Sequence, residues 1–232
     1  KFVNVTGDGT GNVDKLGASI VALGNNFATD ERSIIDMSQR LAAAGKISGL
    51  TSTDILALAA SMSSVGIEAE AGGTAMSQTL TSISKAVAEP GEKLNELAKI
   101  SGMTADQFAA KWKEKPIDAL QAFLKGLGDM NDQGQDTYSV LDDLGMSGIR
   151  QSNMLQSLAL ANENVAKAVN ISTDAYKSDN EAKGKANALT EEASKRYNTQ
   201  AAKISQTREK VKNLAIEVGN KLLPYVQKAL EF

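Results

Sequence analysis

The chain has 232 residues, with 25 Lys and Arg against 28 Asp and Glu, and it contains neither His nor Cys. The absence of Cys excludes disulfides, thiolate nucleophiles and redox pairs, and the absence of His excludes a Ser-His-Asp triad and the usual His/Cys zinc sites. A formal charge of −3 argues against a general nucleic-acid-binding protein. Hydrophobic residues make up 42% of the chain, which is typical of a folded protein with one large domain or two small ones.

Residues 1–12 are rich in glycine, and we expect a linker there. The glycines of residues 7–11 do not match a phosphate-binding loop, because the spacing Gly-x4-Gly-Lys-Ser/Thr is absent. After residue 12, apolar residues recur every three or four positions, which is the period of a helix. The pattern predicts an all-α fold. We expect a compact bundle of many short helices as a globular module over residues 13–180, followed by a long amphipathic helix over residues 181–232.

The first two helices of the bundle are predicted from their apolar faces and their end signals. Leu16 and Leu23 lie on one face of a helix that ends near Phe27. Thr29 then predicts the N-cap of the second helix, with acidic residues in its first turn. Gly45 predicts the end of that helix.

Three junctions share one pattern, in which a Gly ends a helix and an apolar residue precedes a Thr or Ser that caps the next helix. They lie at residues 47–51 (ISGLT), 100–104 (ISGMT) and 144–147 (LGMS). Thr104 and Gln107 also have the spacing of a capping box. The pattern indicates many short helices joined by tight turns.

Between these turns we predict eight further helices, near residues 53–65, 73–88, 91–100, 105–114, 117–130, 136–144, 148–161 and 163–177. Pro90 and Pro116 are expected in the first turns of two of them. Gly73 is expected to mark a turn where a helix starts. The alternative for Gly73 is a small-residue face for close helix packing.

The C-terminal part of the chain differs in pattern and in charge. Tyr197, Ile204, Val211, Val218 and Tyr225 recur every seven residues, which predicts a long amphipathic helix that Pro224 bends or ends. Residues 183–228 hold ten Lys and Arg against four Asp and Glu. This basic segment is interpreted as a solvated helix face, or alternatively as a surface that meets an acidic protein or DNA.

Two candidate catalytic patterns are weak. Ser82 and Lys85 match Ser-x-x-Lys and residues 178–180 match Ser-Asp-Asn, as in penicillin-recognising serine enzymes, but the Lys-Thr-Gly strand of those enzymes is missing. The carboxylate pairs Glu68 with Glu70 and Asp142 with Asp143 have the chemistry of a glycan-cleaving enzyme, without the aromatic surroundings that bind sugars.

Trp112, the single Trp, follows Phe108 by four residues and is expected in the core. The calcium-binding Asp-x-Asp-x-Asp-Gly loop is absent. We therefore predict no catalytic, cofactor-binding or metal-binding residue and no cofactor.

No run of 18 apolar residues occurs, which argues against a transmembrane span in this segment. The first residues lack the pattern of a signal peptide. We expect the chain to be a fragment of a longer protein.

Seven stretches, taken in order, resemble phage tail tape measure proteins of long non-contractile tails, in the central region that this family shares. They are residues 23–27 (LGNNF), 40–46 (RLAAAGK), 63–73 (SSVGIEAEAGG), 120–127 (LQAFLKGL), 144–150 (LGMSGIR), 189–193 (LTEEA) and 215–224 (AIEVGNKLLP). The resemblance covers residues 3–228.

The resemblance implies a structural protein, not an enzyme, that fills the tail tube, sets tail length during assembly and takes part in genome delivery. Its implied partners are further copies of itself, tail tube and tail-tip proteins and tail assembly chaperones, with a weak DNA contact through the basic C-terminal helix. The implied location is the phage tail in the virion, and the cytoplasm of the bacterial host during assembly; a phage and a prophage are equally compatible. Two alternatives stay open: an all-α cell-wall-degrading enzyme domain, and a helical membrane-active or interaction module.

Overall fold

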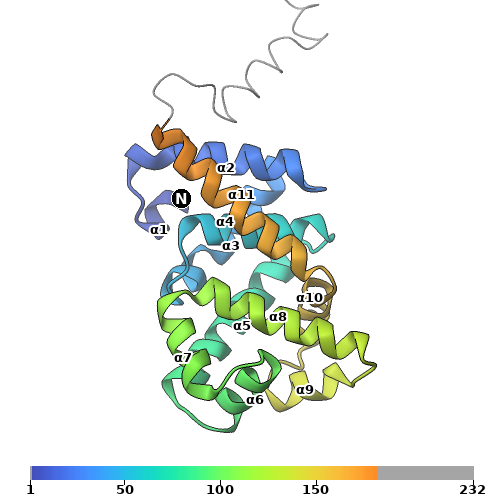
Figure 1. Cartoon of the computed structure of the whole chain (residues 1–232). Helices are drawn as coiled ribbons and strands as arrows, with labels where there is room; N and C mark the ends of the chain where they lie inside the picture. The colour runs from blue at the N-terminus through green and yellow to red at the C-terminus, as the bar shows by residue number, and fades with distance from the viewer. Residues whose placement is uncertain (1, 182–232) are drawn as a thin grey trace, which may run out of the picture. The chain divides into compact units, whose positions relative to one another are not determined.

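The computed structural model describes residues 2–181, and over this range the chain forms eleven α-helices, one 3-10 helix and no strand (Figure 1). The all-α prediction is therefore confirmed for these residues. The long amphipathic helix predicted for residues 181–232 lies, beyond Glu181, outside them. The α-helices are α1 (Phe2–Thr6), α2 (Val13–Asn26), α3 (Glu31–Ile47), α4 (Ser52–Ser64), α5 (Ala69–Ala88), α6 (Glu92–Ile100), α7 (Ala105–Glu114), α8 (Pro116–Asp132), α9 (Thr137–Asp143), α10 (Ile149–Leu160) and α11 (Asn162–Glu181).

The junction pattern found in the sequence ends three helices as predicted. Gly49, Gly102 and Gly145 have φ angles of +86°, +68° and +72°, a region that glycine adopts without the steric cost of a side chain. At the first junction the Gly49 N–H donates to the Lys46 carbonyl and the Leu50 N–H to the Gly45 carbonyl, the paired hydrogen bonds of a Schellman motif. The other two junctions repeat these bonds. All eight helices predicted after residue 52 are present.

Thr51 and Thr104 start the helices that follow two of these turns. Each side chain accepts the backbone N–H three residues later, from Asp54 and Gln107, whose side chains accept the threonine N–H in return. Both capping boxes are formed by local contacts. The prediction for Thr104 and Gln107 is confirmed.

Two predicted end signals of α3 were wrong. Asp30, not Thr29, is the N-cap, because its carboxylate accepts the Ser33 N–H and the Ser33 hydroxyl. The Thr29 hydroxyl instead contacts the Ser63 hydroxyl at 2.6 Å. Gly45 does not end α3. It lies buried within the helix, where an added Cβ would stand 2.8 Å from the Ile55 side chain.

Two further local predictions also need correction. Gly148, not Ser147, is the N-cap of α10, and it makes no side-chain capping bond. Pro90 lies before the Gly91 cap of α6 and therefore outside the helix, whereas Pro116 begins α8 as predicted.

Residues 1–12 do not form the expected linker in the part that is described. Phe2–Thr6 form α1, which packs against α3, and Thr10–Asn12 form a 3-10 turn. The Asp8 carboxylate accepts the hydroxyls of Thr6 and Ser52 and so ties this segment to the start of α4. Phe2 and Val3 also pack against the core, and the glycine content of the segment does not indicate this docking.

Gly73 lies inside α5, four residues after its start, and not at a turn. A Cβ at this position would stand 2.6 Å from the Arg40 Cβ of α3. Gly73 and its neighbour Gly72 therefore permit α3 and α5 to approach closely, which is the alternative that the sequence left open.

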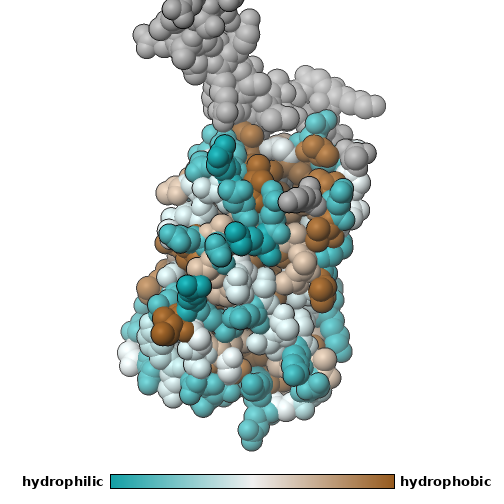
Figure 2. All heavy atoms as spheres, turned by 180° about the vertical axis from the view of Figure 1, so that it is seen from behind, coloured by the Kyte–Doolittle hydropathy of each residue, from teal (hydrophilic) through white to brown (hydrophobic). Residues whose placement is uncertain are grey.

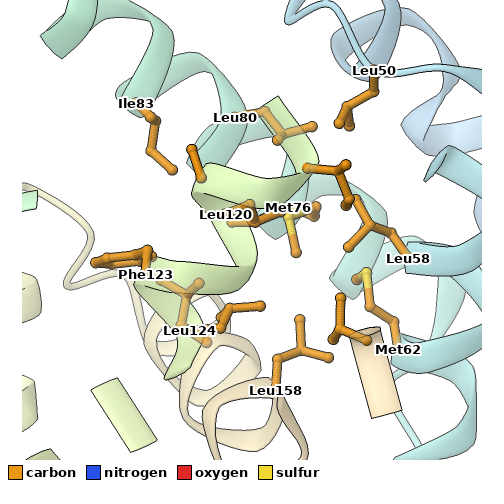
Figure 3. Packing of buried hydrophobic residues seen from close by; sticks show 14 of the residues in the cluster. Leu50, Leu58, Met62, Met76, Leu80, Ile83, Leu120, Phe123, Leu124 and Leu158 are labelled. Atoms are coloured by element: carbon orange, nitrogen blue, oxygen red, sulfur yellow. The ribbon is translucent and has the colours of Figure 1, made fainter. Parts of the chain in front are cut away.

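The centre of the described unit is α4, whose residues from Ser52 to Met62 are all buried. A helix that is apolar on all sides belongs in an interior, and α4 packs against α2, α3 and α11. Figure 3 shows how side chains from four helices point toward one another in this core. Those labelled there include Leu58 and Met62 of α4, Met76 and Leu80 of α5, Leu120 and Leu124 of α8, and Leu158 of α10.

The first and last long helices close the unit by lying side by side in antiparallel directions (Figure 1). The Lys15 ammonium lies over the Tyr176 ring, the Ser19 hydroxyl donates to the Ser172 carbonyl at 2.8 Å, and the Lys167 ammonium lies over the Phe27 ring. Going along α2 from Lys15 to Phe27, the partners on α11 run backwards from Tyr176 to Lys167, so the two helices are antiparallel. As a consequence, Val13 and Glu181 lie at the same end of this helix pair.

Candidate functional site

The structure does not gather the serine-enzyme pattern into one pocket. Ser82 and Lys85 lie on α5 and line a surface hollow of about 370 Å³ whose other residues come from α5, α6, the turn between them and Leu144. Ser178 lies on α11, where its hydroxyl donates to the Ala175 carbonyl. Helix α11 packs on α2, α4 and α8, whereas α5 packs on α3, α6, α7 and α10. The side chains of residues 179 and 180 lie outside the described ones.

The two carboxylate pairs lie in water. Glu68, Glu70, Asp142 and Asp143 are all exposed, and Glu70 faces the Arg40 guanidinium at 4.0 Å. A general acid in a glycosidase depends on an environment that raises its pKa, which is supplied by burial or by a nearby second carboxylate. These exposed side chains have no such burial.

Trp112 is 4% exposed and stacks on Phe108 with ring centroids 6.4 Å apart. The prediction that it belongs to the core is confirmed. Within residues 2–181, no group of three or more Asp and Glu side chains is placed to hold a metal ion.

Two larger hollows lie on the surface. One, of about 570 Å³, lies along α7 and the start of α8 between Met103 and Asp118, and the other, of about 540 Å³, lies between Arg40 of α3 and the outer face of α5. Most residues that line them are exposed side chains of mixed charge or small hydroxyl groups. Both hollows are open to solvent.

Sequence reasoning missed a closed ring of hydrogen bonds that joins three helices. Asn131 of α8 donates to Gln156 of α10 at 2.7 Å, Gln156 donates to Thr137 of α9 at 2.5 Å, and Thr137 donates back to Asn131 at 2.7 Å. A fourth polar side chain, Gln151, donates to the buried Thr79 hydroxyl of α5 at 3.0 Å. These residues lie among polar neighbours in the sequence, so no periodic signal marks them as buried or half-buried.

The ring holds α9 against α10, and the solvent-facing sides of these two helices carry exposed apolar residues. Tyr138, Ile149 and Leu160 are 55%, 79% and 73% exposed. They are three of the seven large hydrophobic side chains that are exposed among the described residues. On the face seen in Figure 2, the lower part, which holds α6, α7 and α9 in Figure 1, is mostly hydrophilic or neutral. An apolar patch on such a surface is typical of a protein contact.

The described features are those of an all-α unit with several exposed apolar side chains and shallow surface hollows. The model of the family described as phage-related minor tail protein matches residues 1–145, which is more than half of the chain, and the chain belongs to this family. It is therefore a structural phage tail protein with its place in the tail of the virion. The match ends at Gly145, in the turn between α9 and α10.

No curated protein and no solved structure matches the chain. Along residues 2–181, none of the helices combines the length and the apolar character needed to cross a bilayer.

Proposed function

We propose that this chain is a part of a tape measure protein, which fills the tail tube, sets tail length during assembly and takes part in genome delivery. The observation that carries the proposal is membership of the minor tail protein family over residues 1–145. The ordered set of stretches that resemble tape measure proteins, from residue 23 to residue 224, supports the narrower assignment.

A length-measuring role requires an extension that grows with the number of residues, and an α-helix supplies about 1.5 Å per residue. Residues 13–180 do not have this property as a folded unit, because α11 returns to lie beside α2. We therefore assign them the role of a globular module for tail contacts. The measuring role belongs to the extended section that we expect to begin within residues 181–232.

The proposal also covers the site residues and the binding partners of the chain. The module acts without catalytic, cofactor-binding or metal-binding residues. It meets tail tube and tail-tip proteins in the virion, and further copies of itself and tail assembly chaperones in the host cytoplasm. The basic segment of residues 183–228 makes a weak DNA contact.

The test is tail length after duplication of residues 191–217 in the gene that encodes the chain. If this segment is extended helix in the tube, 27 further residues lengthen the tail by roughly 40 Å, measured by electron microscopy. The matched control is an insertion of the same 27 residues in the loop between α8 and α9, which is expected to leave tail length unchanged. Unchanged tails with lost infectivity after the duplication would assign the segment to the tail tip or to DNA delivery. Normal tails and normal infection would contradict the proposal.

A further inference from the structure

The outer face of α10 forms a stripe that no described helix covers. Ile149, Asn153 and Leu160 are separated by four and seven residues, so they lie on one side of the helix, and all three are exposed. The Tyr138 hydroxyl of α9 reaches the Asn153 side chain at 3.4 Å, which joins the two helices into one surface. We name Tyr138, Ile149, Asn153 and Leu160 the α9–α10 surface.

The rest of α10 packs in the core or forms hydrogen bonds with neighbouring helices. Its Met154, Leu155 and Leu158 are buried in the core, Gln151 bonds to α5, and Gln156 belongs to the ring that joins α8 and α9. The α9–α10 surface is therefore held in one arrangement by buried contacts behind it. A partner that covers this surface therefore does not have to order the backbone that carries it.

The stretch of sequence around α9 is acidic. Residues 126–149 contain five Asp and no Lys or Arg. Asp129 pairs with Lys125, whereas Asp132, Asp142 and Asp143 have no ion pair within the described residues. Two exposed cations lie nearby, Lys93 beside Gly145 and Arg150 on α10. The partner that fits an apolar stripe accompanied by the acidic residues of α9 is a basic amphipathic helix.

This chain carries such a segment itself. Residues 183–228 hold ten Lys and Arg against four Asp and Glu, with apolar residues repeating every seven positions. Helix α11 starts just after Leu160 and its 20 residues carry the chain about 30 Å away before that segment begins. The described part of α11 thus ends far from Leu160.

We propose that the α9–α10 surface binds residues 183–228 of a second copy of this chain, so that copies associate head to tail. The described unit carries the apolar surface and the sequence that follows α11 supplies the basic amphipathic segment, so each copy holds both halves of the contact. A contact between two different surfaces is heterologous and extends into an open row of copies. The association does not depend on whether the chain sets tail length.

The first test is sedimentation equilibrium of the full 232-residue chain. We expect concentration-dependent association that weakens as salt is raised, because exposed charges are screened. The double variant I149S/L160S is expected to raise the dissociation constant about tenfold or more. The matched control I47S removes an isoleucine that is 85% exposed on α3 and is expected to leave it unchanged.

The variant D142K/D143K changes only exposed side chains and tests the charge without touching the core. It is expected to weaken association, and reversal of Lys203, Arg208 and Lys212 to Glu in the partner copy is expected to restore it. A monomer at all concentrations, or equal effects of I149S/L160S and I47S, would overturn the proposal.

The second test identifies the occupant of the surface. A photo-reactive amino acid in place of Tyr138 is activated in a mixture of unlabelled and 15N-labelled chains. We expect cross-links to peptides of residues 183–228 that join one labelled and one unlabelled chain. Cross-links confined to single chains would show that each copy folds back on itself, and cross-links to other segments would show another partner; either result overturns the proposal.

Discussion

Asp54 is a buried carboxyl group at the start of α4 that serves as a helix cap. It is 7% exposed, and its Oδ2 accepts the backbone N–H of Thr51 at 2.9 Å. Burial raises the pKa of Asp54 above its ordinary value of 3.8, and nearby Asp118 adds to the rise, while the bonds from Thr51 and the charge of Lys115 oppose it. The group therefore stabilises the fold less when it is charged than when it is protonated.

The expected consequence is a pH dependence of stability with a definite sign. The contribution of Asp54 to the free energy of unfolding is fully present below pH 3.8 and is lost as the pH rises through the raised pKa. Asp54→Asn cannot titrate, and its amide oxygen can still accept the Thr51 N–H. We predict that the stability of D54N relative to the original chain decreases as the pH falls from 7 to 4, measured by urea unfolding.

Asp30 supplies the control, because hydrogen bonds from Ser33 lower the pKa of this exposed cap below 3.8. Its contribution is present above pH 3.8 and is lost as the pH falls through the lowered pKa. The relative stability of D30N should therefore stay nearly constant between pH 7 and 4 and increase only below pH 3.8. Equal slopes for the two variants would show that burial does not govern the titration of Asp54.

At the scale of the helices, the ring of Asn131, Thr137 and Gln156 decides where the short helix α9 lies. This helix has seven residues and contributes two buried residues, Thr137 and Leu141. An isolated helix of this length is unstable in water, so α9 depends on its tertiary contacts. Each member of the ring satisfies the polar groups of the other two.

We predict that Gln156→Ala destabilises the protein by about 1–3 kcal/mol, because it removes the bonds of Gln156 to half-buried Asn131 and buried Thr137 and leaves only the bond between those two. Hydrogen exchange should become faster in α9 before it does so in α4. Asn153→Ala on the exposed side of the same helix is the control, with an expected change within about 0.5 kcal/mol. The prediction is wrong if the two substitutions cost the same.

The sequence predicts helices well where local chemistry defines their ends, as Gly49 with Thr51 and Gly102 with Thr104 do. The sequence predicts structure less well where contacts between residues far apart in the chain determine a residue's position. Gly73 lies in a glycine pair that is typical of a turn. The structure instead places it inside α5, where the lack of a side chain leaves room for Arg40 of α3. The exposed α9–α10 surface could not be predicted either, because Ile149 and Leu160 have the spacing of core residues in the sequence.

For the whole molecule, the family match ends at residue 145, whereas the folded unit continues through α10 and α11. The match covers α1 to α9, but α10 and α11 complete the interior. Leu155 and Leu158 of α10, and Val165 and Ala168 of α11, are all fully buried. Without these two helices, apolar faces of α2, α4, α5 and α8 would meet water.

A chain of residues 1–145 is therefore predicted to lack a cooperative thermal transition, whereas a chain of residues 1–181 should unfold cooperatively. Circular dichroism during heating measures both, and binding of a hydrophobic dye should be stronger for the shorter chain. A cooperative transition in the shorter chain would show that the matched region is a domain of its own.

The antiparallel pairing of α2 with α11 determines how the unit responds to a pull on the chain. Because Val13 and Glu181 lie at the same end of the pair, tension applied at both sides of the unit acts on one end of the interface. The contacts of Tyr176, Ser172 and Lys167 then break one after another, as in the opening of a zipper, and not all at once as in sliding. After opening, the 180 described residues can be drawn into a thread about 600 Å long. Such connectivity is expected to give a module that is stable at rest and unfolds step by step when its two ends are pulled.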